Sequence, residues 1–345
     1  MKKFTFLTRL MMAAMLMVSV TLLAGTYSGG SGTSGAPYQI ATTDDLIELS
    51  NTSGDWGAYF IQTVDIAFDS DETQVDWDGD SSADWDAEDQ KGFSPIGNST
   101  TKFLGNYDGQ GHTITNLFID RTEAYLGLFG WIGESSGTDK GNVSNLNLVD
   151  VDISGSGDYI GGLSGFQDIS SAVENVHISG AINGSITSNE VGGLIGEASN
   201  SVTNCSFDGD VTGEYYLGGL IGKSKGDVTT SHSSGNVIAV KNYSGGLIGG
   251  MNGGTVTNSY STSNLSKTAT YVYSAGGFVG HVFSGTISQC YSTGNVVSFR
   301  NYVGGFVGRN LGVINNCFST GNVSGNKGAT LTDFGGFVGW TNLEK

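Results

Sequence analysis

The sequence is poor in cysteine, proline and positive charge, and each shortage excludes a class of protein. Three cysteines in 345 residues, Cys205, Cys290 and Cys317, are too few and too irregularly spaced for a disulfide-stapled secreted domain or a zinc site. The 15 basic residues face 33 acidic ones, so a formal charge of −18 disfavours nucleic acid and anionic lipid as partners. A His-Glu-x-x-His motif is absent, which excludes the zinc metallopeptidases that use it.

Residues 1–25 have the pattern of a secretory signal peptide. Lys2, Lys3 and Arg9 lead into an apolar run over 10–24 that ends in small residues. The run is shorter than the roughly 20 apolar residues of a membrane span, and a Gly/Ser-rich linker over 26–36 follows it. We therefore expect an exported protein, secreted or at the cell surface, with no stable membrane span after signal removal.

Glycine is abundant, with 56 residues against only 2 prolines, and it is periodic. The pattern Gly-[Leu/Phe]-x-Gly occurs at 127–130, 162–165, 193–196, 219–222, 246–249, 277–280, 305–308 and 336–339. In the last seven copies a second glycine precedes the first, at intervals of 26 to 31 residues. Most copies are followed by a segment such as VTNCSFDGDV from Val202 or ISQCYSTGNV from Ile287, which alternates apolar and polar residues as strands do.

One period holds about three short strands separated by Gly-rich corners, and such a unit cannot bury its own apolar side chains. Stacking the units about 4.8 Å apart makes parallel sheets around one continuous core. The sequence predicts an all-β fold, a right-handed parallel β-helix (β-solenoid) of about eight coils over 122–345. Asn145, Asn175 and Asn204 share one repeat position, where stacked amides can bond along the solenoid. The cysteines follow this position and are interpreted as small buried thiols, with a Cys290–Cys317 bridge as the alternative.

Residues 37–121 form an N-terminal cap region ahead of the repeats. Thr42, Asp44 and Asp45 before Leu46 are typical of a helix N-terminus, and a short helix there would cover the open end of the first coil. At the other end, no Val-x-Asn strand follows the last glycine motif. This predicts an incomplete final coil: either the sequence is truncated, or the open edge is covered by a partner or, through edge-to-edge self-association, by another copy of the chain.

These repeats resemble the GLUG-motif family of bacterial secreted and cell-surface proteins. The resemblance rests on the paired GGLIG or GGFVG and NCYSTGNV-like segments over 126–340, and on the cap-region segments PYQIATTDDLIELS (37–50) and FLGNYDGQGHTITNLFI (103–119). It implies an adhesin-like extracellular scaffold and names no ligand. Related repeats lie outside the catalytic domain of IgA-specific metallopeptidases.

An acidic insertion at 69–90 interrupts the cap region. Its carboxylates give a density of hard oxygen ligands that suits Ca²⁺, although the spacing departs from an EF-hand loop. The candidate calcium ligands are Asp76, Asp78, Asp80, Asp84, Asp86 and Glu88. A solvated acidic loop is the alternative, with Trp77 and Trp85 as packing anchors.

The sequence favours a non-catalytic binding, adhesion or structural scaffold over an enzyme. Charged residues of the repeats, among them Glu190 and Lys225, occupy different columns, which argues against the converging groups of a polysaccharide lyase or hydrolase. That enzyme is the first alternative, and an ice-binding Thr-x-Thr array is a minor one. An extracellular glycan or protein is the expected ligand. Aromatic residues near the glycine pairs form an irregular stripe that could contact it: Tyr125, Tyr159, Tyr215, Tyr216, Tyr243, Tyr271, Tyr273, Tyr302 and Phe334.

Overall fold

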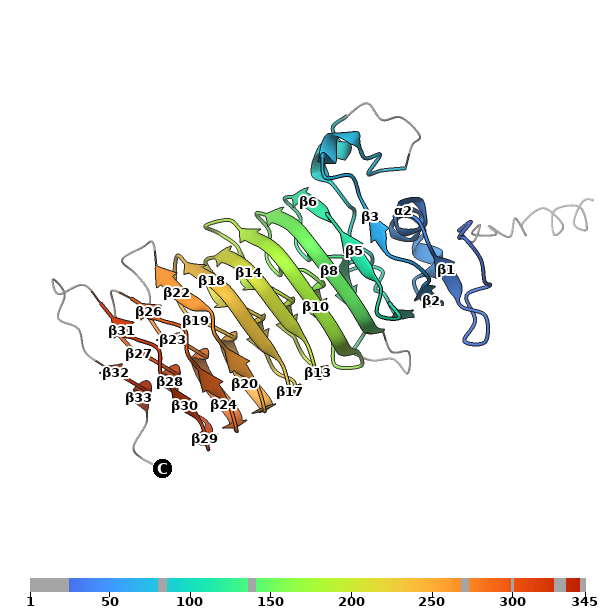
Figure 1. Cartoon of the computed structure of the whole chain (residues 1–345). Coiled ribbons are helices and arrows are strands. Elements are labelled where there is room, and N and C mark those ends of the chain that lie inside the picture. Colours follow the sequence, from blue (N-terminus) through green and yellow to red (C-terminus); the bar gives the residue numbers. More distant parts are fainter. Residues whose placement is uncertain are drawn as a thin grey trace, which may run out of the picture.

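The repeats stack into one long body in the computed structural model, which describes residues 25–79, 86–135, 141–267, 273–298, 301–325 and 333–341. Figure 1 shows the strands following one another from the blue N-terminal region to the red C-terminal end. Successive turns pair in parallel along the whole stack. The expected parallel β-solenoid is confirmed, whereas residues 1–24 of the predicted signal peptide lie outside the described part of the chain.

The expected helix of the cap region is present as α2 (Thr43–Asn51). The Thr42 hydroxyl accepts a hydrogen bond from the Asp45 N–H (3.1 Å), and the Asp45 carboxylate accepts one from the Thr42 N–H (3.0 Å). This capping box satisfies donors that a helix start leaves free. Leu46 and Leu49 are fully buried, and α2 lies at the N-terminal end of the stack (Figure 1). The region also contains β1 (Tyr38–Ile40), β2 (Tyr59–Gln62), β3 (Ile66–Ala67) and the 3-10 turns η1 (Ser53–Asp55), η2 (Glu72–Gln74) and η3 (Asp89–Lys91).

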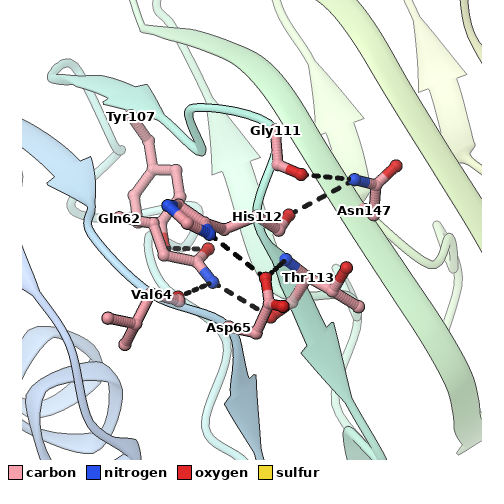
Figure 2. Close-up of polar contacts among 8 residues, drawn as sticks. All are labelled: Gln62, Val64, Asp65, Tyr107, Gly111, His112, Thr113 and Asn147. Carbon is pink, nitrogen blue, oxygen red and sulfur yellow. Dashed lines mark hydrogen bonds and ion pairs between the residues drawn. The ribbon is translucent and has the colours of Figure 1, made fainter.

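A polar network ties the cap region to the first turn (Figure 2). Asp65 Oδ1 accepts a hydrogen bond from the Thr113 N–H (2.9 Å) and lies 3.1 Å from His112 Nδ1. These two bonds hold the pKa of Asp65 below its usual range. Buried Gln62 accepts from the Tyr107 hydroxyl (3.3 Å) and donates to the Thr113 carbonyl (3.0 Å). His112 thus joins two coils, which is a structural role.

Each turn of the solenoid contributes strands to three stretches. The strands that follow the glycine motif are β7 (Phe129–Ile132), β9 (Ser164–Gln167), β12 (Ile195–Ala198), β16 (Ile221–Ser224), β20 (Ile248–Thr257), β24 (Val279–Ser288), β28 (Val307–Asn310) and β33 (Val338–Thr341). The next stretch comprises β4 (Asn106–Asp108), β5 (Thr113–Thr115), β6 (Phe118–Arg121), β8 (Asn142–Gly155), β10 (Ala172–Gly184), β13 (Val202–Thr203), β14 (Ser206–Gly213), β17 (Val228–Thr229), β18 (His232–Ala239), β21 (Tyr260–Ser261), β22 (Asn264–Lys267), β25 (Tyr291–Ser292), β26 (Val296–Val297), β29 (Val313–Asn315), β30 (Phe318–Ser319) and β31 (Val323–Ser324).

The third stretch is a short sheet just before the glycine motif, and it corrects the coil count. Its strands are β11 (Asn189–Gly192), β15 (Tyr215–Gly218), β19 (Ser244–Gly245), β23 (Ala275–Gly276), β27 (Val303–Gly304) and β32 (Phe334–Gly335). Among the described residues, these six strands define about six complete turns, slightly fewer than the eight expected. The first two motif copies reach this sheet only through the isolated bridges of Leu126 and Ile160, so their turns are less regular.

The Leu/Phe position of the motif forms an inward stack. Phe278, Phe306 and Phe337 stack with ring centroids 4.7 and 4.9 Å apart and planes within 6°. A Cβ on Gly246 would lie 2.1 Å from the Gly277 carbonyl oxygen, so the backbones of adjacent turns approach too closely for a side chain there. The motif therefore alternates a large core residue with a residue that has no side chain.

The amide and cysteine columns lie where the repeat predicted. Asn145, Asn175 and Asn204 adopt φ values of 51° to 54°, a left-handed conformation that asparagine tolerates. Asn204 Nδ2 donates to Asn175 Oδ1, and Asn175 Nδ2 donates to Asn145 Oδ1, both at 2.9 Å. The three cysteines are free thiols; Cys205 and Cys290 are buried, whereas Cys317 is only half-buried.

Candidate functional site

The acidic insertion brings together a set of carboxylates different from the predicted one. Asp76, Asp78 and Asp89 each offer an oxygen within 4.8 Å of the others. Asp86 instead accepts the N–H groups of Glu88 (2.7 Å) and Asp89 (3.2 Å), and Glu88 pairs with a lysine. The predicted ligands Asp80 and Asp84 lie outside the described residues. The three clustered aspartates are called the acidic cluster below.

Burial distinguishes Asp89 from the other two members of the acidic cluster. It is 2% exposed, and its carboxylate accepts the Trp77 N–H (2.8 Å). Trp77 is itself buried against Phe68, with ring centroids 4.7 Å apart, as expected of a packing anchor. Trp85 lies outside the described residues. A buried carboxylate with one N–H donor retains lone pairs for a cation, and hard oxygen ligands of this kind suit Ca²⁺.

A second candidate site lies along the solenoid, at the corner that each turn makes at the six-stranded short sheet. The residues at this corner form a column: Tyr125, Tyr159, Glu190, Tyr216, Tyr243, Ser274, Tyr302 and Asp333. All eight have positive φ, between 47° and 69°. For residues other than glycine and asparagine this conformation costs about 1–2 kcal/mol, yet five of the eight positions hold tyrosine. Turn geometry alone would favour glycine or asparagine here, and the packing of these rings on their neighbours, as Tyr125 packs on Tyr159 (4.9 Å), offsets part of the cost.

A second column runs beside the first, one residue after the last glycine of each motif. Strand register aligns Trp131, Phe166, Glu197, Lys223, Gly250, His281, Arg309 and Trp340. The two columns pack against each other: Tyr125 lies 4.9 Å from Trp131, and Tyr243 lies 5.2 Å from His281, between ring centroids. Together they form a half-buried band along the solenoid axis, called the aromatic strip below.

Charged residues converge where the aromatic strip lacks rings, contrary to the expectation that they would stay apart. Lys223 Nζ lies 3.0 Å from Glu197 Oε2 and 4.0 Å from Glu190 Oε1, and Lys225 pairs with the other oxygen of Glu197. These four residues are called the Glu–Lys cluster. Glu190 and Lys225 do belong to different sequence columns, as predicted, but neighbouring turns bring them together. The adjacent positions of Glu197 and Lys223 in consecutive motifs were the available sequence signal.

Burial sets the electrostatics of the Glu–Lys cluster. It raises the pKa of Glu190 to about 7, although Lys223 opposes the shift. Burial also raises the pKa values of the flanking phenols Tyr159 and Tyr216, so both remain neutral hydrogen-bond donors. The Lys223 ammonium lies 5.3 Å from the centroid of the Tyr216 ring. The Glu–Lys cluster is thus a polar interruption between the rings of Tyr159 and Tyr216, which are called the two platforms below.

Other cations lie over rings along the same strip. Lys102 is 5.3 Å from the Trp131 ring centroid, and the Arg309 guanidinium is 4.7 Å from that of Trp340. His281 is 1% exposed, neither ring nitrogen has a hydrogen-bond partner among the described residues, and burial lowers its pKa to about 4. It therefore packs on Phe283 as a neutral ring, with centroids 3.8 Å apart.

A separate set of rings forms on the sheet of β18, β21, β25 and β30. His232, Tyr260, Tyr291 and Phe318 stack with centroid spacings of 4.7 to 5.2 Å and interplanar angles of 2° to 9°. They are called the aromatic ladder. The predicted stripe contained none of them. Other residues of the predicted stripe lie in neither column of the aromatic strip. Lys241 Nζ is 5.4 Å from the ring centroid of Tyr215, Tyr273 is 41% exposed, and Tyr271 is outside the described residues.

The family described as the GLUG motif matches residues 187–212, 271–297 and 300–324, so the chain carries GLUG repeats. Halomucin of Haloquadratum walsbyi is 33% identical over 225 residues, which are 64% of this chain and 2% of halomucin. A protein of Evansella cellulosilytica assigned as a Gly-rich membrane protein is 33% identical over 144 residues, 40% of this chain and 14% of that protein. The chain therefore matches only a small part of either relative.

A solved structure has the same architecture. A Bacteroides ovatus protein assigned as an immunoglobulin A1 protease superposes with a TM-score of 0.52 over 90% of this chain and 87% of its own, at 18% identity. At this identity the likeness shows the fold alone. In the part of the chain that the structure describes, no helix is long and apolar enough to cross a bilayer.

Proposed function

We propose that this chain is an exported, surface-associated, non-catalytic scaffold that binds an extracellular glycan along the aromatic strip. The aromatic strip carries this proposal, because it combines apolar ring faces with neutral phenol donors and cations in one band. Such amphipathic rings suit sugars, which have an apolar face and a hydroxyl edge. The GLUG repeats and the names of the mucin and membrane-protein relatives support a surface location.

A glycan array probed with the exported form of the chain tests this function. Replacing both Tyr159 and Tyr216 by alanine should weaken binding of any captured glycan at least about tenfold, because both platforms beside the Glu–Lys cluster are lost. Tyr291→Ala in the aromatic ladder is the matched control and should leave affinity unchanged. Equal loss in both variants, or no captured glycan, would contradict the proposal.

Polysaccharide cleavage remains the second candidate, favoured by one observation. Glu190, whose pKa is raised to about 7, lies beside Glu197, which is paired with Lys223, and a general acid beside a second carboxylate is the arrangement that glycoside hydrolases use. Against catalysis, two lysines already occupy both oxygens of Glu197. Incubation of the protein with the glycans that it captures separates the two functions: new reducing ends would indicate an enzyme, and intact polymer a binding scaffold.

We also propose that the acidic cluster binds Ca²⁺, supported by three carboxylates within 4.8 Å, one of them buried. Calorimetric titration of the chain with Ca²⁺ should give a binding isotherm that Asp89→Asn weakens. Glu88→Gln is the control, because Glu88 pairs with Lys91 (2.6 Å) outside the cluster. An isotherm lost in Glu88→Gln but kept in Asp89→Asn would instead favour the predicted set with Asp86 and Glu88. If Ca²⁺ gives no heat and no change in melting temperature, neither the acidic cluster nor the predicted set of ligands binds it.

A further inference from the structure

We infer that the ligand of the aromatic strip is an acidic polysaccharide, whose uronate carboxylates bind Lys223 and Lys225 while neighbouring sugar rings lie on Tyr159 and Tyr216. This inference rests on the proposed function and names the ligand class of the same site. It is carried by the distribution of charge, by the geometry of the Glu–Lys cluster and by the spacing of the platforms.

The aromatic strip of this strongly acidic chain carries four cations beside its acidic members Glu190, Glu197 and Asp333. The sequence has 33 acidic and only 15 basic residues, so most of its surface repels a polyanion. Four of the described cations, Lys102, Lys223, Lys225 and Arg309, nevertheless lie on this strip, and three of them are over its rings. A neutral glycan would gain little from this arrangement. A polyanion would gain a contact at each of these cations, and at Lys223 and Lys225 it meets two of them beside Glu190 and Glu197.

The Glu–Lys cluster has room for one more anion because Glu190 is weakly held. Its side chain is 11% exposed, and Lys223 at 4.0 Å is beyond hydrogen-bond distance. No hydrogen bond reaches this carboxyl from any other described residue. The remaining charged groups that influence Glu190 are Glu197, Asp158 and Lys225. An incoming carboxylate would therefore take the position on Lys223 that Glu190 does not fill.

Proton uptake by Glu190 offsets the repulsion that this third carboxylate brings. With all four groups ionised, the Glu–Lys cluster is neutral; a protonated Glu190 gives it one positive charge. Because burial already raises the pKa of Glu190 to about 7, protonation is cheap at neutral pH. Binding should thus take up about half a proton at pH 7, where Glu190 is already about half protonated, and close to one proton at pH 8, with no covalent change in either partner.

The platforms fit a chain of sugars that runs along the solenoid. Tyr159 and Tyr216 belong to turns on either side of Glu190, so they are two strand spacings apart, roughly 10 Å. Rings in successive turns repeat at the strand spacing, which is close to the length of one sugar in an extended polysaccharide. The ligand would therefore present one uronate to the Glu–Lys cluster and a neighbouring ring to each tyrosine.

Calorimetry with polygalacturonate, alginate and hyaluronate, each beside its carboxyl-methyl ester, tests the inference. We expect at least one acid form to bind about tenfold or more tighter than its ester, the fold-change of one charge-assisted contact. Lys225→Ala should lower affinity about tenfold. Lys91→Ala is the control, since this lysine is also ion-paired and similarly exposed (39% against 40%), and it should have no effect. Thermal melts verify that both variants fold.

Titrations between pH 6 and 8 test the proton. Affinity should be nearly constant below pH 7 and fall up to about tenfold per unit above it, because the protonated form of Glu190 becomes scarce. Glu190→Gln should remove this dependence. Ester and acid forms binding equally would overturn the acidic ligand while leaving glycan binding intact. Binding independent of Lys225 or of pH would overturn the role of the Glu–Lys cluster, and no binding to any glycan would overturn both proposals.

Discussion

The aromatic ladder and the aromatic strip use similar residues in opposite ways. Ladder rings come from one repeat position in successive turns, so they lie nearly parallel, within 9°, and cover one another's faces. Strip rings come from two columns and many are tilted, as at 48° for Tyr125 with Trp131 and 63° for Tyr243 with His281. Cations also lie over their faces, as Lys102 does over Trp131 and Arg309 over Trp340. A single periodic column therefore stabilises the solenoid, whereas two unequal columns form the candidate site.

The largest expected effect comes from a change that breaks both regions at once. Gly246→Val places a Cβ 2.1 Å from the Gly277 carbonyl oxygen, where backbone must move, so we expect a loss of more than about 4 kcal/mol in urea denaturation. Gly336→Val is the control at the same motif position, because no atom of the described residues lies within 4 Å of a Cβ at Gly336. Light scattering of this control also tests the predicted self-association, which it should weaken.

The next effect distinguishes the strip by its dependence on pH. The folded-state pKa of Glu190, about 7, lies above its ordinary value of 4.5, so the folded chain binds more protons between these values. The stability contributed by this group is full below pH 4.5 and is lost as pH rises to 7, by up to about 3 kcal/mol. Urea denaturation of Glu190→Gln should show a stability gain over the parent that grows across this window. A constant difference would contradict it.

The comparison of variant with parent is required because a second strip residue opposes Glu190. The pKa of His281 falls to about 4, so the stability that it contributes is lost as pH falls below its ordinary value of 6.5. Since His281 is present in both proteins, its effect cancels in the difference. The parent curve alone would show little slope.

Removal of a ladder ring should affect stability without affecting glycan affinity. Tyr291→Ala loses stacking on Tyr260 (4.9 Å) and on Phe318 (5.2 Å), which together contribute about 1–3 kcal/mol. Chemical denaturation measures the loss, and calorimetry with the captured glycan supplies the contrast. A stable Tyr291→Ala protein with impaired binding would show that the ladder, too, is a ligand site.

The smallest effect is the pH response of the ladder. Burial lowers the pKa of His232, so the stability that it contributes is present above pH 6.5 and lost as pH falls. This sign is opposite to that of Glu190 on the strip. His232→Asn should therefore flatten the acid side of the stability curve slightly, measured by thermal melts between pH 5 and 7. An unchanged acid slope would show that this histidine is solvated in both states.

Much of the fold was readable from recurrence, but the coil count was not. The glycine motif, the inward Leu/Phe stack and the side-chain hydrogen bond between Asn175 and Asn145 follow from residues that repeat at one position. Whether a turn is complete depends instead on whether the short segment before its glycine motif forms a strand that pairs with the same segment of the next turn. Around Leu126 and Ile160 it does so only through isolated bridges.

The candidate sites were predicted less well because their members do not recur. The calcium site predicted in the acidic insertion stays a prediction, and folding groups Asp76 and Asp78 with Asp89, while Asp86 binds local N–H groups. The tyrosines of the strip were noticed as an irregular stripe. Their partners after the motif were not, because Trp131 and Arg309 share no chemistry that a sequence column would reveal.

The sequence by itself determined the parallel solenoid. A repeat of nearly fixed length, with a glycine beside a large apolar residue, buries its apolar side chains when successive turns stack in register. The sequence also determined the short helix, through its capping residues. Only the tertiary structure decided which unlike side chains meet. The distances from Lys223 to Glu190 and to Glu197 depend on the strand register between turns. They also depend on the left-handed backbone conformation of Glu190, which turns its column toward the other. Strand alternation within a single repeat carries no information on that approach.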